Sequence, residues 1–245
     1  GEFVDSDTLS GLSYILKKKR RGVNIVAVSA SYGGPSRNPL VLDQIAELGR
    51  AGIIWVGAAG NNAVNDDVSP VREFVTSADT PNIISVAATN STGGLADFSC
   101  FGRRTVDLGA PGQNINSTVI ASAYKVFNGT SMATPFVSGA VALLAAKYPD
   151  DTVWTRIRRV LSTVDALPAL SGKTLTGGRL NAKAALASSP TLMPFVVNAS
   201  TQQGLSAGTA FTLKGFGFGT AQGRLVFEDS PGTETAGSLS LWADE

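Results

Sequence analysis

The chain has 245 residues, of which 43% are hydrophobic and 16% are charged, a balance that excludes an intrinsically disordered protein. Its formal net charge of +1 argues against a protein that binds nucleic acid through a dense surface of phosphate contacts. No apolar stretch reaches the roughly 20 residues that a membrane-spanning helix needs. The single cysteine, Cys100, excludes an intrachain disulfide framework.

Helical and strand patterns alternate through the first part of the chain. Leu9, Leu12 and Leu16 recur at helical spacing, and "GVNIVAVSAS" (22–31) then predicts a strand. The segment "PLVLDQIAELGRAG" (39–52) predicts a second amphipathic helix that glycines close. Two apolar runs follow, "IIWVGAAG" and "NIISVAAT". Neither run alternates cleanly, which indicates strands covered on both faces of a parallel sheet.

Helices dominate the next part of the chain. A polar segment follows Pro111, and we then expect helices over about 131–147, 151–162 and 181–187. This order predicts an α/β domain over residues 1–188, with a parallel sheet flanked by helices in three layers.

The composition changes at "SSPTLMPF" (188–195). The glycine-rich run "GTAFTLKGFGFGTAQGRLVF" with alternating apolar residues predicts a small all-β segment over 189–245. This tail is short for a β-sandwich of about 100 residues, so we expect a truncated module.

One serine lies at the start of the longest predicted helix, in "NGTSMATPFVSGAVALL" (128–144). Backbone N–H groups at a helix N-terminus lack helical partners and favour an approaching anion, so Ser131 is a candidate nucleophile. Thr130 or Ser131 could equally be an ordinary helix cap, and the motif alone leaves both interpretations open.

Three further segments could build a site around that serine. Asn61 follows a predicted strand, at the kind of strand end where ligands gather in α/β sheets, although "GNN" could also be a plain turn. In "VSASYGGPS" another strand breaks into glycines and could pair with an extended peptide. The fourth segment, "VDLGAPG" (106–112), contains a tight turn that could be only a connection.

Together these segments resemble the subtilisin-like serine peptidases. The serine motif, "AAGNN", "SYGG", "APG" and "GGRLNAKAAL" occur in the order of that family and cover about 8–187. The resemblance implies a secreted peptidase of polypeptide substrates that requires no cofactor. It implies that Ser131 attacks the scissile carbonyl, and that the Asn61 side chain and the Ser131 N–H hold the oxyanion. It also implies a substrate cleft lined by Ser31, Tyr32, Gly33, Ala58, Ala59 and Gly60.

The sequence departs from the family at its catalytic base. Subtilisins order their triad as aspartate, histidine and serine, whereas this chain contains no histidine and nothing that resembles the aspartate motif. Phe136 also stands where the family usually has a histidine outside the triad. We therefore expect an N-terminal catalytic segment to be missing, and the chain alone to be a very poor peptidase.

Two other functions stay open at this point. One is a weak esterase-like acyl hydrolase that uses Ser131 without histidine. The other is a binding or structural protein, because the tail resembles the start of an immunoglobulin-like module of the IPT/TIG type. A missing segment would leave a sheet edge open, so we also expect a homodimer or a rearranged sheet.

A structural calcium ion is possible by resemblance to the family. Asp107 falls where the family can supply a carboxylate, and "NNAVNDD" concentrates oxygen ligands at Asn65, Asp66 and Asp67. A solvated acidic loop explains the second segment equally well.

Overall fold

The structure is a computed structural model that describes residues 5–34, 38–69, 78 and 80–189, together with four strands between residues 195 and 237. The chain divides into two compact units, Gly1–Pro190 and Thr191–Glu245. The first unit contains all four segments of the candidate site.

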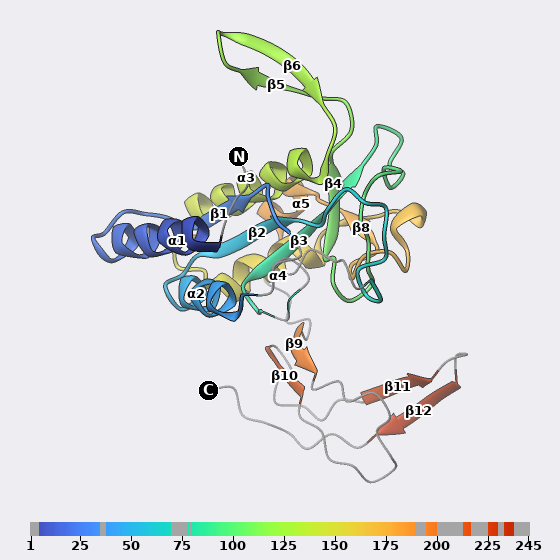
Figure 1. Cartoon of the computed structure of the whole chain (residues 1–245). Coiled ribbons are helices and arrows are strands. Elements are labelled where there is room, and N and C mark those ends of the chain that lie inside the picture. Colours follow the sequence, from blue (N-terminus) through green and yellow to red (C-terminus); the bar gives the residue numbers. More distant parts are fainter. Residues whose placement is uncertain are drawn as a thin grey trace. The chain divides into compact units, whose positions relative to one another are not determined.

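A six-stranded, mainly parallel sheet forms the centre of the first unit (Figure 1). In spatial order its strands are β1 (Ala27–Ala30), β2 (Ile54–Ala58), β3 (Ile83–Thr89), β4 (Leu108–Pro111), β8 (Gly178–Arg179) and β7 (Asp165–Ala166). The four strands β1 to β4 are parallel, and β7 pairs antiparallel with β8. Every residue of β2 and β3 is buried, which explains their continuous apolar runs. The predicted α/β fold is confirmed.

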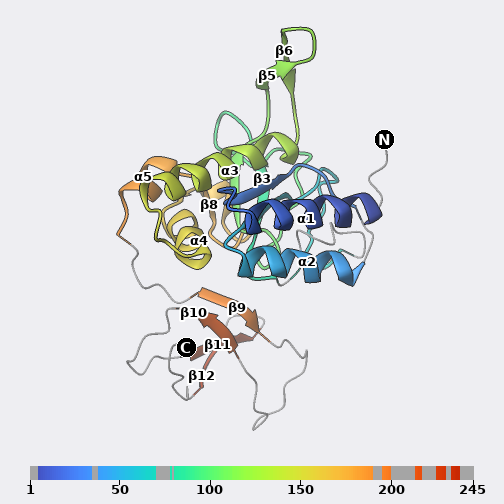
Figure 2. The same ribbon diagram turned by 90° about the vertical axis from the view of Figure 1, so that its left-hand side faces the viewer.

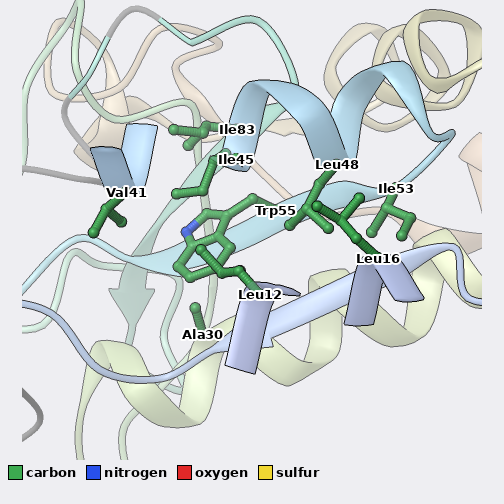
Figure 3. Packing of buried hydrophobic residues seen from close by; sticks show 9 residues of the cluster. All are labelled: Leu12, Leu16, Ala30, Val41, Ile45, Leu48, Ile53, Trp55 and Ile83. Atoms are coloured by element: carbon green, nitrogen blue, oxygen red, sulfur yellow. The ribbon is translucent and has the colours of Figure 1, made fainter. Parts of the chain in front are cut away.

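Two helices pack on one face of this sheet around Trp55. They are α1 (Asp5–Arg20) and α2 (Pro39–Arg50). Figure 3 shows the indole of Trp55 between Leu12 of α1 and Ile45 of α2, and all three side chains are at most 1% exposed. The Asn38 side chain caps α2 by accepting a hydrogen bond from the Leu40 N–H. This packing fixes the direction of β1 and β2, whose ends carry two of the candidate segments.

A long apolar helix, α3 (Thr130–Lys147), runs along the opposite face of the sheet and contacts β1 to β4 (Figure 2). Small and apolar residues occur on all of its sides. One face is buried, whereas Phe136 and Leu143 on the outer side are 44% and 54% exposed. Two helices, α4 (Val153–Ser162) and α5 (Ala182–Ala187), contact α3, and a short 3-10 turn covers Pro168–Leu170. The helices expected after residue 130 are thus present.

The polar segment after Pro111 forms a hairpin that the sequence did not predict. Strands β5 (Ile115–Val119) and β6 (Ala123–Phe127) pair antiparallel and extend away from the sheet before the chain enters α3 (Figure 1). The turn uses Ala121 and Ser122 at positive φ, without the glycine or asparagine that usually signals such a turn. Most residues of both strands are exposed or half-buried, so the sequence lacks a clear apolar alternation.

The second unit is described only as four strands. Strand β9 (Phe195–Ala199) pairs antiparallel with β10 (Leu213–Phe216), and β11 (Leu225–Asp229) with β12 (Thr233–Gly237). The likeness of this tail to an immunoglobulin-like module stays a prediction. In the described part of the chain, no helix has the length and apolar character needed to cross a membrane.

Candidate active site

The ends of β1 and β2 meet the first turn of α3. Ser31 follows the last residue of β1, Asn61 lies three residues after β2, and Ser131 is the second residue of α3. Because β1 and β2 are parallel, their carboxyl ends lie at the same edge of the sheet, where α3 begins. The structure therefore brings together three segments that are far apart in the sequence.

Two glycines allow the chain to turn into α3. Gly129 adopts a φ of 156°, and its N–H donates a 2.8 Å hydrogen bond to the Gly112 carbonyl. A Cβ atom at Gly112 would lie 2.5 Å from the Ala88 Cβ and 2.8 Å from the Gly129 carbonyl oxygen, so only glycine fits there. Ala110 and Pro111 of the predicted "APG" turn instead end strand β4, and Gly112, which follows it, supports the backbone that leads to Ser131.

Thr130 fixes the orientation of the Asn61 amide. The Asn61 Oδ1 accepts hydrogen bonds from the Thr130 N–H at 2.9 Å and from the Thr130 hydroxyl at 3.0 Å. The Thr130 hydroxyl in turn accepts a 3.1 Å bond from the Gly60 N–H, and Thr130 itself is fully buried. Since Oδ1 is held by these donors, the Asn61 Nδ2 faces away from Thr130, and it lies 3.6 Å from the position of a Cβ on Gly129. The amide N–H of Asn61 is therefore held beside Gly129, two residues before Ser131.

Over the described residues, the hydroxyl of Ser131 has a backbone carbonyl as its hydrogen-bond acceptor and contacts no basic side chain. Its Oγ donates a 3.1 Å bond to the Ser31 carbonyl, and the Ser31 Oγ donates a 2.7 Å bond to the Ser131 carbonyl. A peptide carbonyl cannot take up the proton that a serine must lose to become a nucleophile. Because the chain has no histidine, the usual base is missing from the sequence itself.

The other residues predicted to line the cleft differ in how much of their surface is exposed near Ser131. Ala58 and Ala59 are 6% and 0% exposed, so neither presents more than a trace of surface to a substrate. Both backbone groups of Gly60 are bonded within the protein, the N–H to Thr130 and the carbonyl to the Cys100 N–H. Gly33 is exposed on the segment that follows β1.

The side chain of Tyr32 points toward the helical layer. Its ring stands edge-on to the ring of Trp55, with centroids 6.1 Å apart and an interplanar angle of 82°. Burial raises the pKa of the Tyr32 phenol, while a hydrogen bond with Thr8 of α1 opposes that shift. Tyr32 therefore links the predicted substrate segment to α1 and to the core.

Asp107, the first carboxylate proposed as a calcium ligand, immediately precedes β4. Its Oδ2 accepts a 2.7 Å hydrogen bond from the Ser85 N–H. Desolvation nevertheless raises the pKa of this carboxyl to about 7, because one hydrogen bond only partly offsets the cost of removing the charge from water. Over the described residues, no cluster of three or more carboxylate, cysteine or histidine side chains could hold a metal ion.

Asn65 and Asp67 of the acidic loop use side-chain oxygen atoms within the protein, and Asp66 between them is 1% exposed. The Asn65 Oδ1 accepts a hydrogen bond from the Asp67 N–H. The Asp67 carboxylate accepts bonds from the N–H groups of Arg104 and Thr105 and from the Thr105 hydroxyl. These bonds join the loop to residues 104–105. A structural calcium ion stays a prediction.

Two functional contacts were not identified from the sequence. Thr130 was considered only as a helix cap, although its hydroxyl connects Gly60 to Asn61. The side chain of Ser31 was included only as part of a substrate strand. For Thr130, the signal available in the sequence was its position next to Ser131 in the "NGTS" motif. For Ser31 there was no local signal, because its contact joins residues 100 positions apart.

Comparisons with known proteins identify the family to which the chain belongs. The family model "Subtilase family" matches residues 1–189. The chain is 38% identical over 132 residues to Subtilisin amylosacchariticus from Bacillus subtilis subsp. amylosacchariticus, covering 54% of this chain and 33% of that protein. It is 33% identical over 156 residues to Subtilisin BL from Lederbergia lenta, covering 63% of this chain and 54% of that protein. The chain thus spans between a third and about half of the length of these relatives.

Two solved structures share the fold. One belongs to the study of subtilase cytotoxin SubAB assembly, with a TM-score of 0.64 and 24% identity over 76% of this chain and 66% of that chain. The other is the Prenylagaramide maturation protease PagA, also with a TM-score of 0.64, at 18% identity over 76% of this chain and 68% of that chain. The family model covers well over half of the chain, and the solved structures reproduce its sheet and helices. This protein therefore belongs to the subtilase family of serine peptidases.

Proposed function

We propose that this chain carries the nucleophile and the oxyanion hole of a subtilisin-like serine endopeptidase. The observation that supports this proposal most strongly is the fixed amide of Asn61, whose Oδ1 is held by Thr130 while its Nδ2 lies beside the segment that leads to Ser131. Such preorganised donors stabilise the negative charge that develops on a carbonyl oxygen during acyl transfer.

The proposed reaction begins with attack of the Ser131 Oγ on the carbonyl carbon of a peptide bond. The hydroxyl proton passes to a histidine imidazole, while the carbonyl oxygen takes the negative charge and binds the Asn61 Nδ2 and the Ser131 N–H. When the tetrahedral intermediate collapses, the C–N bond breaks and the imidazole returns the proton to the leaving amine. Water then hydrolyses the acyl-enzyme by the same route.

The imidazole must come from a polypeptide outside these 245 residues. Ser131 contacts Ser31, the residue that follows β1. In the described sheet β1 is an edge strand, paired with β2 on one side and with no strand on the other. A segment that lies along the other edge of β1 would arrive beside Ser131. We propose that this segment carries the aspartate and the histidine, in the triad order of the family.

A complementation assay tests the proposed peptidase function. The chain is mixed with the part of Subtilisin BL that carries that protein's aspartate and histidine, and cleavage of a chromogenic peptide anilide is followed. We expect cleavage only in the mixture, and none when Ser131→Ala replaces the wild-type chain. A mixture that co-elutes as a complex but leaves the anilide intact would contradict the proposal.

The chain by itself has a second candidate activity, the slow hydrolysis of activated esters. The specific observation is that Thr130 fixes the amide of Asn61, the proposed oxyanion donor, although the chain has no histidine to act as a base. An activated ester has a good leaving group that needs no proton, so the oxyanion hole alone can assist its cleavage. Turnover of p-nitrophenyl acetate that Ser131→Ala abolishes would support this activity, and equal turnover by both proteins would exclude it.

A further inference from the structure

The first turns of α3 contain a proline at a position that affects Ser131 directly. In an α-helix the carbonyl of residue i accepts a hydrogen bond from the N–H of residue i+4. For Ser131 that residue is Pro135, which has no N–H and whose ring presses against the carbonyl four residues earlier. The helix therefore supplies no i+4 donor to the carbonyl of Ser131.

Ser31 supplies the missing donor. Its hydroxyl donates a 2.7 Å hydrogen bond to the Ser131 carbonyl across a separation of 100 residues. The bond is matched by the 3.1 Å bond that the Ser131 hydroxyl donates to the Ser31 carbonyl. The two serines thus form a reciprocal pair that fastens the end of β1 to the first turn of α3.

We infer that Ser31 is a positioning residue for Ser131, acting through its hydroxyl, which replaces the helical hydrogen bond that Pro135 removes. The inference rests on the proposed function of Ser131 as nucleophile. The bond to its carbonyl fixes the peptide unit that follows Ser131, and the bond from its hydroxyl selects one side-chain rotamer. Both the attacking Oγ and the oxyanion-binding N–H belong to the residue that is held in this way.

This arrangement also couples the nucleophile to the strand end that we expect to hold the substrate. The distance between Ser131 and β1 depends on Ser31, because the two hydrogen bonds join these elements directly. A small shift of the nucleophile relative to a bound carbonyl carbon has a large effect on rate. Loss of the Ser31 hydroxyl should therefore slow attack by Ser131 more than it changes the affinity for a ligand.

A set of variants tests this inference through the reaction of Ser131 with a fluorophosphonate probe. Ser31→Ala should slow labelling about fivefold to tenfold, as expected for the loss of one hydrogen bond. Ser31→Thr retains the hydroxyl and should react at close to the wild-type rate. Ser29→Ala is the matched control, since Ser29 is exposed two residues earlier on β1, and its labelling rate should not change.

The decisive variant combines Ser31→Ala with Pro135→Ala. Alanine at position 135 provides the N–H that the Ser131 carbonyl lacks, so the double variant should recover most of the labelling rate lost in Ser31→Ala. The same compensation should appear in the melting temperature. Ser31→Ala should lower the melting temperature of the wild-type chain but have little effect on that of the Pro135→Ala variant.

Each possible result either supports or overturns the inference that Ser31 positions Ser131. Ser31→Ala that labels at the wild-type rate, or a slowed Ser31→Ala that Pro135→Ala does not restore, would overturn the inference. A wild-type chain that takes no label would count against the proposed function instead. In that case the melting temperatures decide: additive effects of the two substitutions would overturn the inference, and non-additive effects would support it.

Discussion

The two halves of the candidate site differ in how completely this chain builds them. On the oxyanion side, the buried Thr130 connects Gly60 and Asn61 through hydrogen bonds of 2.9 to 3.1 Å. On the nucleophile side, Ser131 is half-buried, and its hydroxyl donates a hydrogen bond to the backbone carbonyl of the exposed Ser31. The oxyanion side depends on residues within one folded unit, whereas proton transfer requires a group that the sequence lacks. Stabilisation of charge and movement of a proton can thus be tested separately here.

The largest expected effect concerns the oxyanion side. Removal of the corresponding asparagine in a subtilisin costs about 10²- to 10³-fold in kcat, and we expect Asn61→Ala to slow fluorophosphonate labelling of Ser131 by a comparable factor. The exposed neighbour Asn62→Ala serves as the control and should label normally. Equal rates for both variants would show that the fixed amide of Asn61 does not act on the oxyanion.

A core substitution distinguishes stability from site chemistry. Leu48 of α2 is fully buried in the cluster around Trp55, so Leu48→Ala should lower the free energy of unfolding by about 2 to 5 kcal/mol. Denaturant titration measures this loss. Labelling of the fraction that remains folded should not change, because Leu48 lies in the helical layer away from Ser131. If the folded fraction of Leu48→Ala also labels more slowly than the wild type, the site depends on packing in the helical layer.

Asp107 belongs to neither half of the site and should affect stability through pH. Its pKa in the folded state is raised to about 7, against about 4 in an unfolded chain. The folded protein therefore binds this proton more tightly, and the free energy of unfolding should fall as the pH rises from about 4 to about 7, by at most about 4 kcal/mol. The contribution is complete below the lower pKa and is lost above the higher one.

The variant Asp107→Asn isolates this titration. Asparagine cannot lose a proton but keeps an oxygen that accepts the hydrogen bond from the Ser85 N–H. Denaturant titrations at several pH values should give a flatter stability curve for Asp107→Asn between pH 4 and pH 7 than for the wild type. Parallel curves would show that the titration of Asp107 does not control stability in this range.

The smallest expected effect tests whether the Thr130 hydroxyl stabilises the protein. Thr130→Val removes the hydroxyl between the Gly60 N–H and the Asn61 Oδ1 and should lower the free energy of unfolding by about 1 to 3 kcal/mol, because the buried Gly60 N–H loses its partner. Thr130→Ser retains the hydroxyl and should retain most of the stability. If the two variants unfold alike, the hydroxyl does not hold this side of the site together.

The sequence predicted the elements that have a strong pattern. Apolar periodicity located α1 and α2, and continuous apolar runs located β2 and β3. The hairpin of β5 and β6 was not predicted, because its strands are covered on neither face and its turn at Ala121 and Ser122 lacks glycine. Elements with one buried face show a periodic apolar pattern in the sequence, whereas an exposed hairpin such as that of β5 and β6 shows none.

For the site, motifs could suggest residues but not the contacts between them. The order of "SYGG", "AAGNN" and "NGTS" indicated which segments would meet, by resemblance to a family. The rotamer of Asn61 and the reciprocal bonds of Ser31 depend on contacts between residues 69 and 100 positions apart, which follow only from the folded sheet. The effect of Pro135 on the carbonyl of Ser131 could have been read from their spacing of four residues within the predicted helix.

The most direct measurement is the intact mass of the chain after incubation with a fluorophosphonate probe, with and without added imidazole as an external base. We predict slow formation of one adduct on Ser131, faster formation with imidazole, and no adduct on Ser131→Ala. This result would show a positioned nucleophile and oxyanion hole that lack only a base. Absence of an adduct under both conditions, or equal labelling of wild type and Ser131→Ala, would contradict the account.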